Sequence, residues 1–235
     1  MSKTFDNYEE QVTAQVPDSK VHDSIPGLLK SVADDYSRYR PYETQTEKTG
    51  DGTTSAWDVP SDWVNGFSQL ISVEYPQGNL PAEYLEEEDY DVYYDVTLVK
   101  WRLRLFNTTP ATDEKVRFNY TTKHTLLENT AVTIQDNDFY AVCDMASEKA
   151  CIVLATMYAP SNDSTIGADS VNHASKVSEY SKLAKEFRKS WQDRLGVSPD
   201  KPTEGQALIV EEELHSGLDQ LHMMFHGKHR WSWPE

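Results

Sequence analysis

The sequence predicts an α+β fold, with a helical core of long antiparallel helices, an inserted antiparallel β region and an extended C-terminal arm. Apolar residues recur at steps of three and four near both ends of the core and alternate with polar residues between them. A segment rich in proline and glycine then precedes the last thirty residues. The expected parts are residues 1–41 and 136–196 for the helical core, 42–135 for the β-rich insertion, and 197–235 for the linker and C-terminal arm.

The first forty residues are expected to form helices that are interrupted at Pro17. Ser24 is the expected N-cap of the second helix because Pro26 follows in its first turn, and Pro41 should end that helix. The apolar stripes are Phe5, Tyr8 and Val12, then Leu28, Leu29, Val32 and Tyr36.

The insertion has the two-residue period of β-strands. Its clearest strand is expected at residues 97–106, where Trp101, Leu103 and Leu105 share one face. Alternation resumes at residues 116–120. We expect these two strands to pair as a hairpin, with residues 107–114 as its loop.

Two long helices are expected after the insertion, over residues 136–160 and 173–195. Asp136 or Asn137 could cap the first of them, and Gly196 should close the second. The first should be largely buried because its apolar face is so wide.

Composition limits the classes of function. With 39 acidic and 22 basic side chains, the formal charge of −17 would repel DNA, which argues against a sequence-reading DNA-binding protein but not against a conduit that DNA slides through. The N-terminus has no secretory signal pattern and no apolar run is long enough for a membrane helix, so we expect a cytoplasmic setting and no membrane partner. Cys143 and Cys151 lie about 12 Å apart on one helix, too far for a disulfide bond.

Sequence motifs for catalysis are absent: there is no phosphate-binding glycine loop, nucleophile elbow, zinc-protease motif or paired Cys-x-x-Cys. We therefore expect neither an enzyme nor a cofactor. A cluster of histidines near the end is the best metal candidate, although an amphipathic segment that binds a neighbouring subunit is the favoured interpretation. The histidines are His215, His222, His226 and His229.

Opposite charges are segregated along the chain. An acidic run between residues 83 and 95 lacks the oxygen spacing and central glycine of a calcium loop, and the last long helix is locally basic. The basic side chains of that helix could contact packaged DNA or an acidic neighbour, but the favoured interpretation is a solvated face on which Glu179, Glu186 and Asp193 pair with them. The predicted subunit-interface residues are Glu86, Glu87, Glu88, Asp89, Lys185, Arg188 and Lys189.

Several strings resemble the head-to-tail connector or adaptor proteins of tailed phages. They are YSRYRP at residues 36–41, PSDWVNGF at 60–67, ISVEYP at 71–76 and DSTIGADSVN at 163–172. The resemblance covers roughly residues 20–196 and implies a helical core within a ring, commonly of twelve copies. It further implies a portal protein above, another neck or tail protein below, genomic DNA passing without sequence specificity, and no catalytic residues. Such a protein is assembled in the host cytoplasm and resides in the virion neck.

The C-terminal arm is expected to bind the portal. Its short apolar run suits a strand that is donated to a partner's sheet, and further apolar positions follow. The predicted portal-binding residues are Leu208, Ile209, Val210, Leu218, Leu221, Phe225, Trp231 and Trp233.

Two other functions stay open at this stage. A tail-completion or stopper protein would occupy a lower ring of the same neck. A carbohydrate-binding or hydrolase β module could instead use exposed aromatic side chains such as Trp57 and Trp63, unless these serve the core of the insertion.

Overall fold

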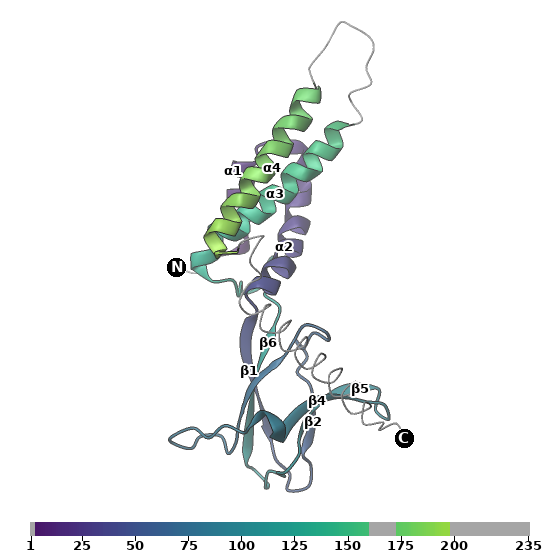
Figure 1. Ribbon diagram of the computed structural model, residues 1–235, viewed down its shortest axis with the longest axis vertical. Coiled ribbons are helices and arrows are strands. Elements are labelled where there is room, and N and C mark those ends of the chain that lie inside the picture. Colours follow the sequence, from purple (N-terminus) through teal and green to yellow (C-terminus); the bar gives the residue numbers. More distant parts are fainter. Residues whose placement is uncertain (1–2, 160–172, 198–235) are drawn as a thin grey trace, which may run out of the picture.

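The computed structural model describes residues 3–159 and 173–197. The molecule is elongated, with the helices gathered in one half and the strands in the other (Figure 1). The predicted mixed α+β class is confirmed.

The N-terminal segment forms α1 (Phe5–Gln15), a short 3₁₀ helix η1 (Ser19–Ser24) and α2 (Ile25–Tyr39). A capping box joins Thr4 and Asn7 at the start of α1. Ser24 precedes α2 as predicted, with Pro26 in the first turn, but its side chain makes no capping hydrogen bond.

The two longest helices are α3 (Phe139–Tyr158) and α4 (His173–Leu195), which lie side by side (Figure 1). The start of α3 contacts the end of α4, and the end of α3 contacts the first half of α4. Asp144, near the start of α3, accepts a hydrogen bond from Arg194, whereas Tyr158, at the end of α3, stacks on Tyr180. Gly196 ends α4 as predicted, with a φ of 71°.

The helical half is built around α3, which is buried along most of its length. Its N-terminal half packs with α1, α2 and the end of α4, and its C-terminal half packs with η1 and the start of α4. This arrangement confirms the prediction that a wide apolar face marks a central helix.

The β half contains two three-stranded antiparallel sheets that share one hydrophobic cluster. One sheet has the order β1-β6-β3 and the other β2-β5-β4. The strands are β1 (Tyr42–Thr49), β2 (Ala56–Asp58), β3 (Leu70–Glu74), β4 (Tyr90–Asp95), β5 (Lys100–Leu105) and β6 (Lys115–Thr122), with a short 3₁₀ helix η2 (Glu87–Asp89) before β4.

The predicted hairpin between the strands at 97–106 and 116–120 is wrong. β5 pairs with β4 and β2, and β6 pairs with β1 and β3, so residues 107–114 cross from one sheet to the other. β5 also begins later than predicted, because Asp95 opposes Lys100 in the β4–β5 register and residues 96–99 form the turn. Period-two alternation identifies a strand but carries no information about its partner.

The tryptophans of the insertion serve its internal packing. Trp57 contacts the shared cluster, with its ring centroid 5.8 Å from that of Phe118, and Trp63 lies 5.7 Å from Tyr120. The alternative in which these side chains serve the core of the insertion is confirmed for Trp57, whereas Trp63 is half-buried and contacts Tyr120 outside the shared cluster.

Asp138, which precedes α3, holds the C-terminal end of α2. Its carboxylate accepts hydrogen bonds from the Tyr36 hydroxyl and from Arg40 Nη1, both at 2.5 Å. Burial, together with this carboxylate, raises the pKa of Tyr36 well above its usual value. The predicted cap by Asp136 or Asn137 is wrong, because these residues belong to the 3₁₀ helix η3 (Asp136–Asp138), which precedes α3. The N-cap position of α3 is Asp138, and its side chain bonds Tyr36 and Arg40 and makes no capping hydrogen bond.

Candidate interaction surface

Two buried carboxylates of α3 determine how α4 is held. Asp144 and Glu148 lie one turn apart and are only 3% and 7% exposed. Asp144 accepts hydrogen bonds from Ser190 Oγ at 2.7 Å and Arg194 Nε at 3.0 Å. Buried carboxylates need such partners, so they fix the register of the two helices.

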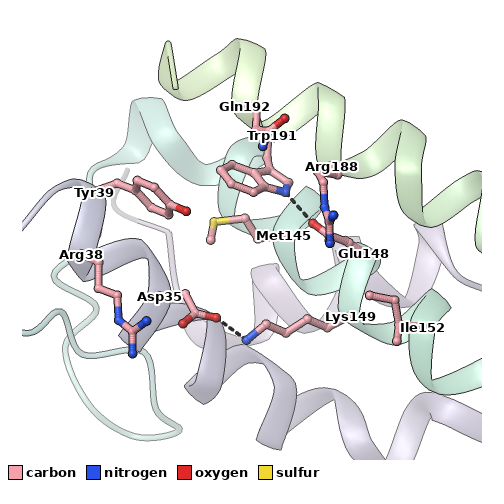
Figure 2. Close-up of a pocket in the computed structure, with 10 residues that line it drawn as sticks. All are labelled: Asp35, Arg38, Tyr39, Met145, Glu148, Lys149, Ile152, Arg188, Trp191 and Gln192. Carbon is pink, nitrogen blue, oxygen red and sulfur yellow. Dashed lines mark hydrogen bonds and ion pairs between the residues drawn. The ribbon is translucent and has the colours of Figure 1, made fainter. Parts of the chain in front are cut away.

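Glu148 binds two side chains of α4 (Figure 2). Arg188 donates from Nε at 2.7 Å and from Nη2 at 2.6 Å, and the buried indole of Trp191 donates from Nε1 at 2.6 Å. The Trp191 ring also contacts the ring of Tyr39 on α2, at 5.6 Å between centroids. Glu148 thus connects α3, α4 and, through Trp191, α2.

Beside these contacts, the surface is hollowed along the seam between α3 and α4. One hollow of about 460 Å³ lies among α2, α3 and α4 (Figure 2), and a second of about 460 Å³ continues between α3 and α4. The two share Glu148, Ile152 and Arg188 as lining residues. We call the combined feature the α3–α4 trough.

The trough carries an excess of positive charge. Its lining includes four cationic side chains and two carboxylates, which leaves two positive charges in a chain whose formal charge is −17. Lys149 pairs with Asp35, and Arg188 with Glu148. The two remaining cations, Arg38 and Lys185, make no ion pair within the described part of the chain.

The second hollow of the trough is mainly apolar. Ile152, Ala155, Val177 and Ala184 line it, and Ile152 is 45% exposed although it belongs to the most apolar helix. An apolar floor beside unpaired cations suits a ligand segment that combines aliphatic and acidic side chains.

A different surface lies in the β half, at the turn between β4 and β5. Val96 and Val99 are 80% and 71% exposed there, and Leu98 is exposed as well. Asp95 shapes the turn by accepting hydrogen bonds from the backbone N–H groups of Thr97 and Leu98. We call residues 96–99 the β4–β5 turn.

The predicted interface residues are divided between the helical half and the β half. Glu86, Glu87 and Glu88 are exposed just before β4, and Asp89 accepts a hydrogen bond from Asn107. Lys185 and Lys189 are exposed on α4, and Arg188 is half-exposed beside Glu148. A single subunit does not bring the acidic and basic groups together, because they belong to opposite halves of the molecule (Figure 1).

The expected pairing within α4 is wrong for its two arginines. Arg188 pairs with Glu148 and Arg194 with Asp144, both on α3. These carboxylates are buried, so an arginine gains more from them than from an exposed carboxylate on its own helix.

The remaining predicted sites fall outside the described residues. This applies to the portal-binding residues Leu208, Ile209, Val210, Leu218, Leu221, Phe225, Trp231 and Trp233, and to the histidines His215, His222, His226 and His229. Within residues 3–159 and 173–197, no group of three or more histidine, cysteine or acidic side chains is placed to hold a metal ion. No helix of that described part combines the length and apolar character needed to cross a membrane.

Sequence reasoning missed Asp144 and Glu148. The signal was present, because two carboxylates four residues apart interrupt an otherwise apolar helix, and buried carboxylates require donors. Cys143 and Cys151 form no disulfide bond, as predicted, and both thiols are buried. Burial raises the pKa of the Cys151 thiol to about 11.

No model of a known protein family matches the sequence, and no curated protein matches it. Among solved structures, the chain is similar to a chain of one described as "Neck of empty GTA particle computed with C6 symmetry". The sequence identity is 10%, the similarity covers 68% of this chain and 77% of that chain, and the TM-score is 0.28.

Proposed function

We propose that the protein is a structural subunit of the neck of a tailed-phage-like particle, a head-to-tail adaptor that assembles into a ring. The observation that carries the proposal is the presence of two chemically unlike surfaces on one elongated molecule. A ring is built from heterologous contacts, in which one face of a subunit meets a different face of the next. The basic face of α4 and the acidic segment before β4 supply such a pair.

The position in a neck follows from the resemblance of residues 20–196 to phage connectors. The proposed partners are further copies of the chain, commonly twelve, a portal protein on one side and a neck or tail protein on the other. Genomic DNA would pass through the ring without being read. A tail-completion or stopper protein would have the same kind of contacts but would dock below the adaptor instead of on the portal.

Imaging tests the proposal directly. Electron microscopy and native mass spectrometry of the purified protein, alone and mixed with a portal protein, should show closed rings that dock on the portal. Rings that bind only a preformed portal–adaptor complex would instead indicate a stopper. A protein that stays monomeric and does not bind the portal at any concentration tested would overturn the proposal.

Charge variants test the contact between subunits. K189E should raise the protein concentration needed for ring formation at least about tenfold, because it places like charges across the contact. K30E is a matched control, since Lys30 is also exposed on a helix, α2, and the charge change is equal. Adding E87K to K189E should restore assembly, whereas equal effects of K189E and K30E would contradict the assigned contact.

A further inference from the structure

The α3–α4 trough is an incompletely covered surface within the described residues. Ile152 is 45% exposed at its centre, and Lys185 and Arg38 project from its lining without a carboxylate partner in that part of the chain. An occupant should therefore bring aliphatic side chains for the floor and negative charges for the cations.

The chain itself contains a segment with this chemistry. Residues 207–214 read ALIVEEEL, so three aliphatic residues, Leu208, Ile209 and Val210, are followed by three consecutive glutamates. The segment carries three negative charges, against the two positive charges in excess in the trough. It lies beyond Val197, the last described residue, which is two positions after the end of α4.

The segment can reach the trough of its own subunit. From Leu195 back to Val177, the far end of the trough, α4 extends about 27 Å at 1.5 Å per residue. Residues 198–206 form a spacer of nine residues, which spans up to about 30 Å when extended. A tether of this length gives an effective concentration in the millimolar range, so even a weak contact is occupied.

We propose that residues 207–214 dock in the α3–α4 trough of the same chain, with the aliphatic residues against the floor around Ile152 and the glutamates beside Lys185. This contact would cover in the free subunit a surface that neighbours Lys189, a residue of the proposed ring contact. The inference does not rest on the role in a phage neck.

Thiol labelling of the full-length chain tests the contact. An I152C variant introduces a reporter at the centre of the trough, and the native thiols are buried. Labelling of Cys at this position should become about tenfold faster when the glutamates are reversed as E211K/E212K/E213K, as expected for a weak contact at millimolar effective concentration. An arm variant with the same charge change, D200K/E204K/D219K, should leave the rate unchanged.

Two further measurements make the test specific. L183C reports on an exposed position of α4 outside the trough lining, and its labelling rate should not respond to either arm variant. Adding K185E to I152C should also speed labelling. Combining K185E with E211K/E212K/E213K should restore part of the protection. Equal rates in all arm variants would overturn the proposal, as would protection that grows with protein concentration, which would identify a second copy as the occupant.

Discussion

Removal of the Glu148 carboxylate should destabilise the protein mainly through Trp191 and only slightly through Arg188. Both side chains donate to Glu148 at similar distances, 2.6 Å for Trp191 Nε1 and 2.6 to 2.7 Å for Arg188. Their environments differ, because the indole is buried whereas the Arg188 side chain is 57% exposed.

The expected magnitudes follow from that difference in exposure. A hydrogen bond to a charged group contributes about 1.5–3 kcal/mol, and a buried indole N–H left without an acceptor has no access to water. The Arg188–Glu148 pair has one exposed partner, at 57%, and one buried partner, at 9%, so it should lie near the upper end of the roughly 0.2–1 kcal/mol of exposed pairs, because water solvates the guanidinium once the carboxylate is gone. The free energy of unfolding should therefore fall by about 3 kcal/mol in E148A and by less than about 1 kcal/mol in R188A.

Urea denaturation, followed by circular dichroism, measures these changes as shifts in the transition midpoint at constant slope. Double-mutant cycles isolate the pairwise terms: E148A with W191F should give a coupling of about 2 kcal/mol, and E148A with R188A less than about 1 kcal/mol. A coupling to Arg188 equal to or larger than that to Trp191 would refute the view that burial, and not distance, decides the strength of these contacts.

Three further predictions concern other parts of the molecule. Burial lowers the pKa of His124 below 6.5, so the unfolded chain binds the proton more tightly than the folded protein does. The melting temperature should therefore fall as the pH drops below 6.5, and H124N should make this fall shallower. A melting temperature that depends on pH equally in H124N and in the unaltered protein would contradict the prediction. G50A should destabilise by about 1–3 kcal/mol in urea denaturation because its Cβ would lie 2.5 Å from a carbonyl oxygen, whereas G27A, with open space on α2, should stabilise by about 0.5–1 kcal/mol. Cys143 and Cys151 should react with a thiol reagent only after unfolding; rapid labelling of the folded protein would contradict their burial.

Local features of the fold were predictable because they depend on neighbours in the sequence. The 3.6-residue spacing of apolar side chains located α3 and α4, and the alternation located β5 and β6. Gly196 marked the end of α4 because a glycine adopts the left-handed conformation that closes a helix at little cost.

Partner choice was not predictable in the same way. β5 and β6 are neighbours in sequence, yet they belong to different sheets, because each strand pairs with the segment whose hydrogen-bonding edge and apolar face meet it in three dimensions. The same holds for Arg188 and Arg194, whose partners are on another helix, and for Asp138, which accepts a hydrogen bond from Tyr36, 102 residues earlier in the sequence.

The sequence by itself determined the mixed α+β class, the positions of the long helices and the segregation of acidic from basic segments, since each of these is a property of composition and spacing. Only the tertiary structure decided which strands pair, which carboxylates are buried and where the surface is hollow. Burial is the physical reason for this division: it changes the strength of a polar contact several-fold, and it depends on chain segments that are remote in the sequence.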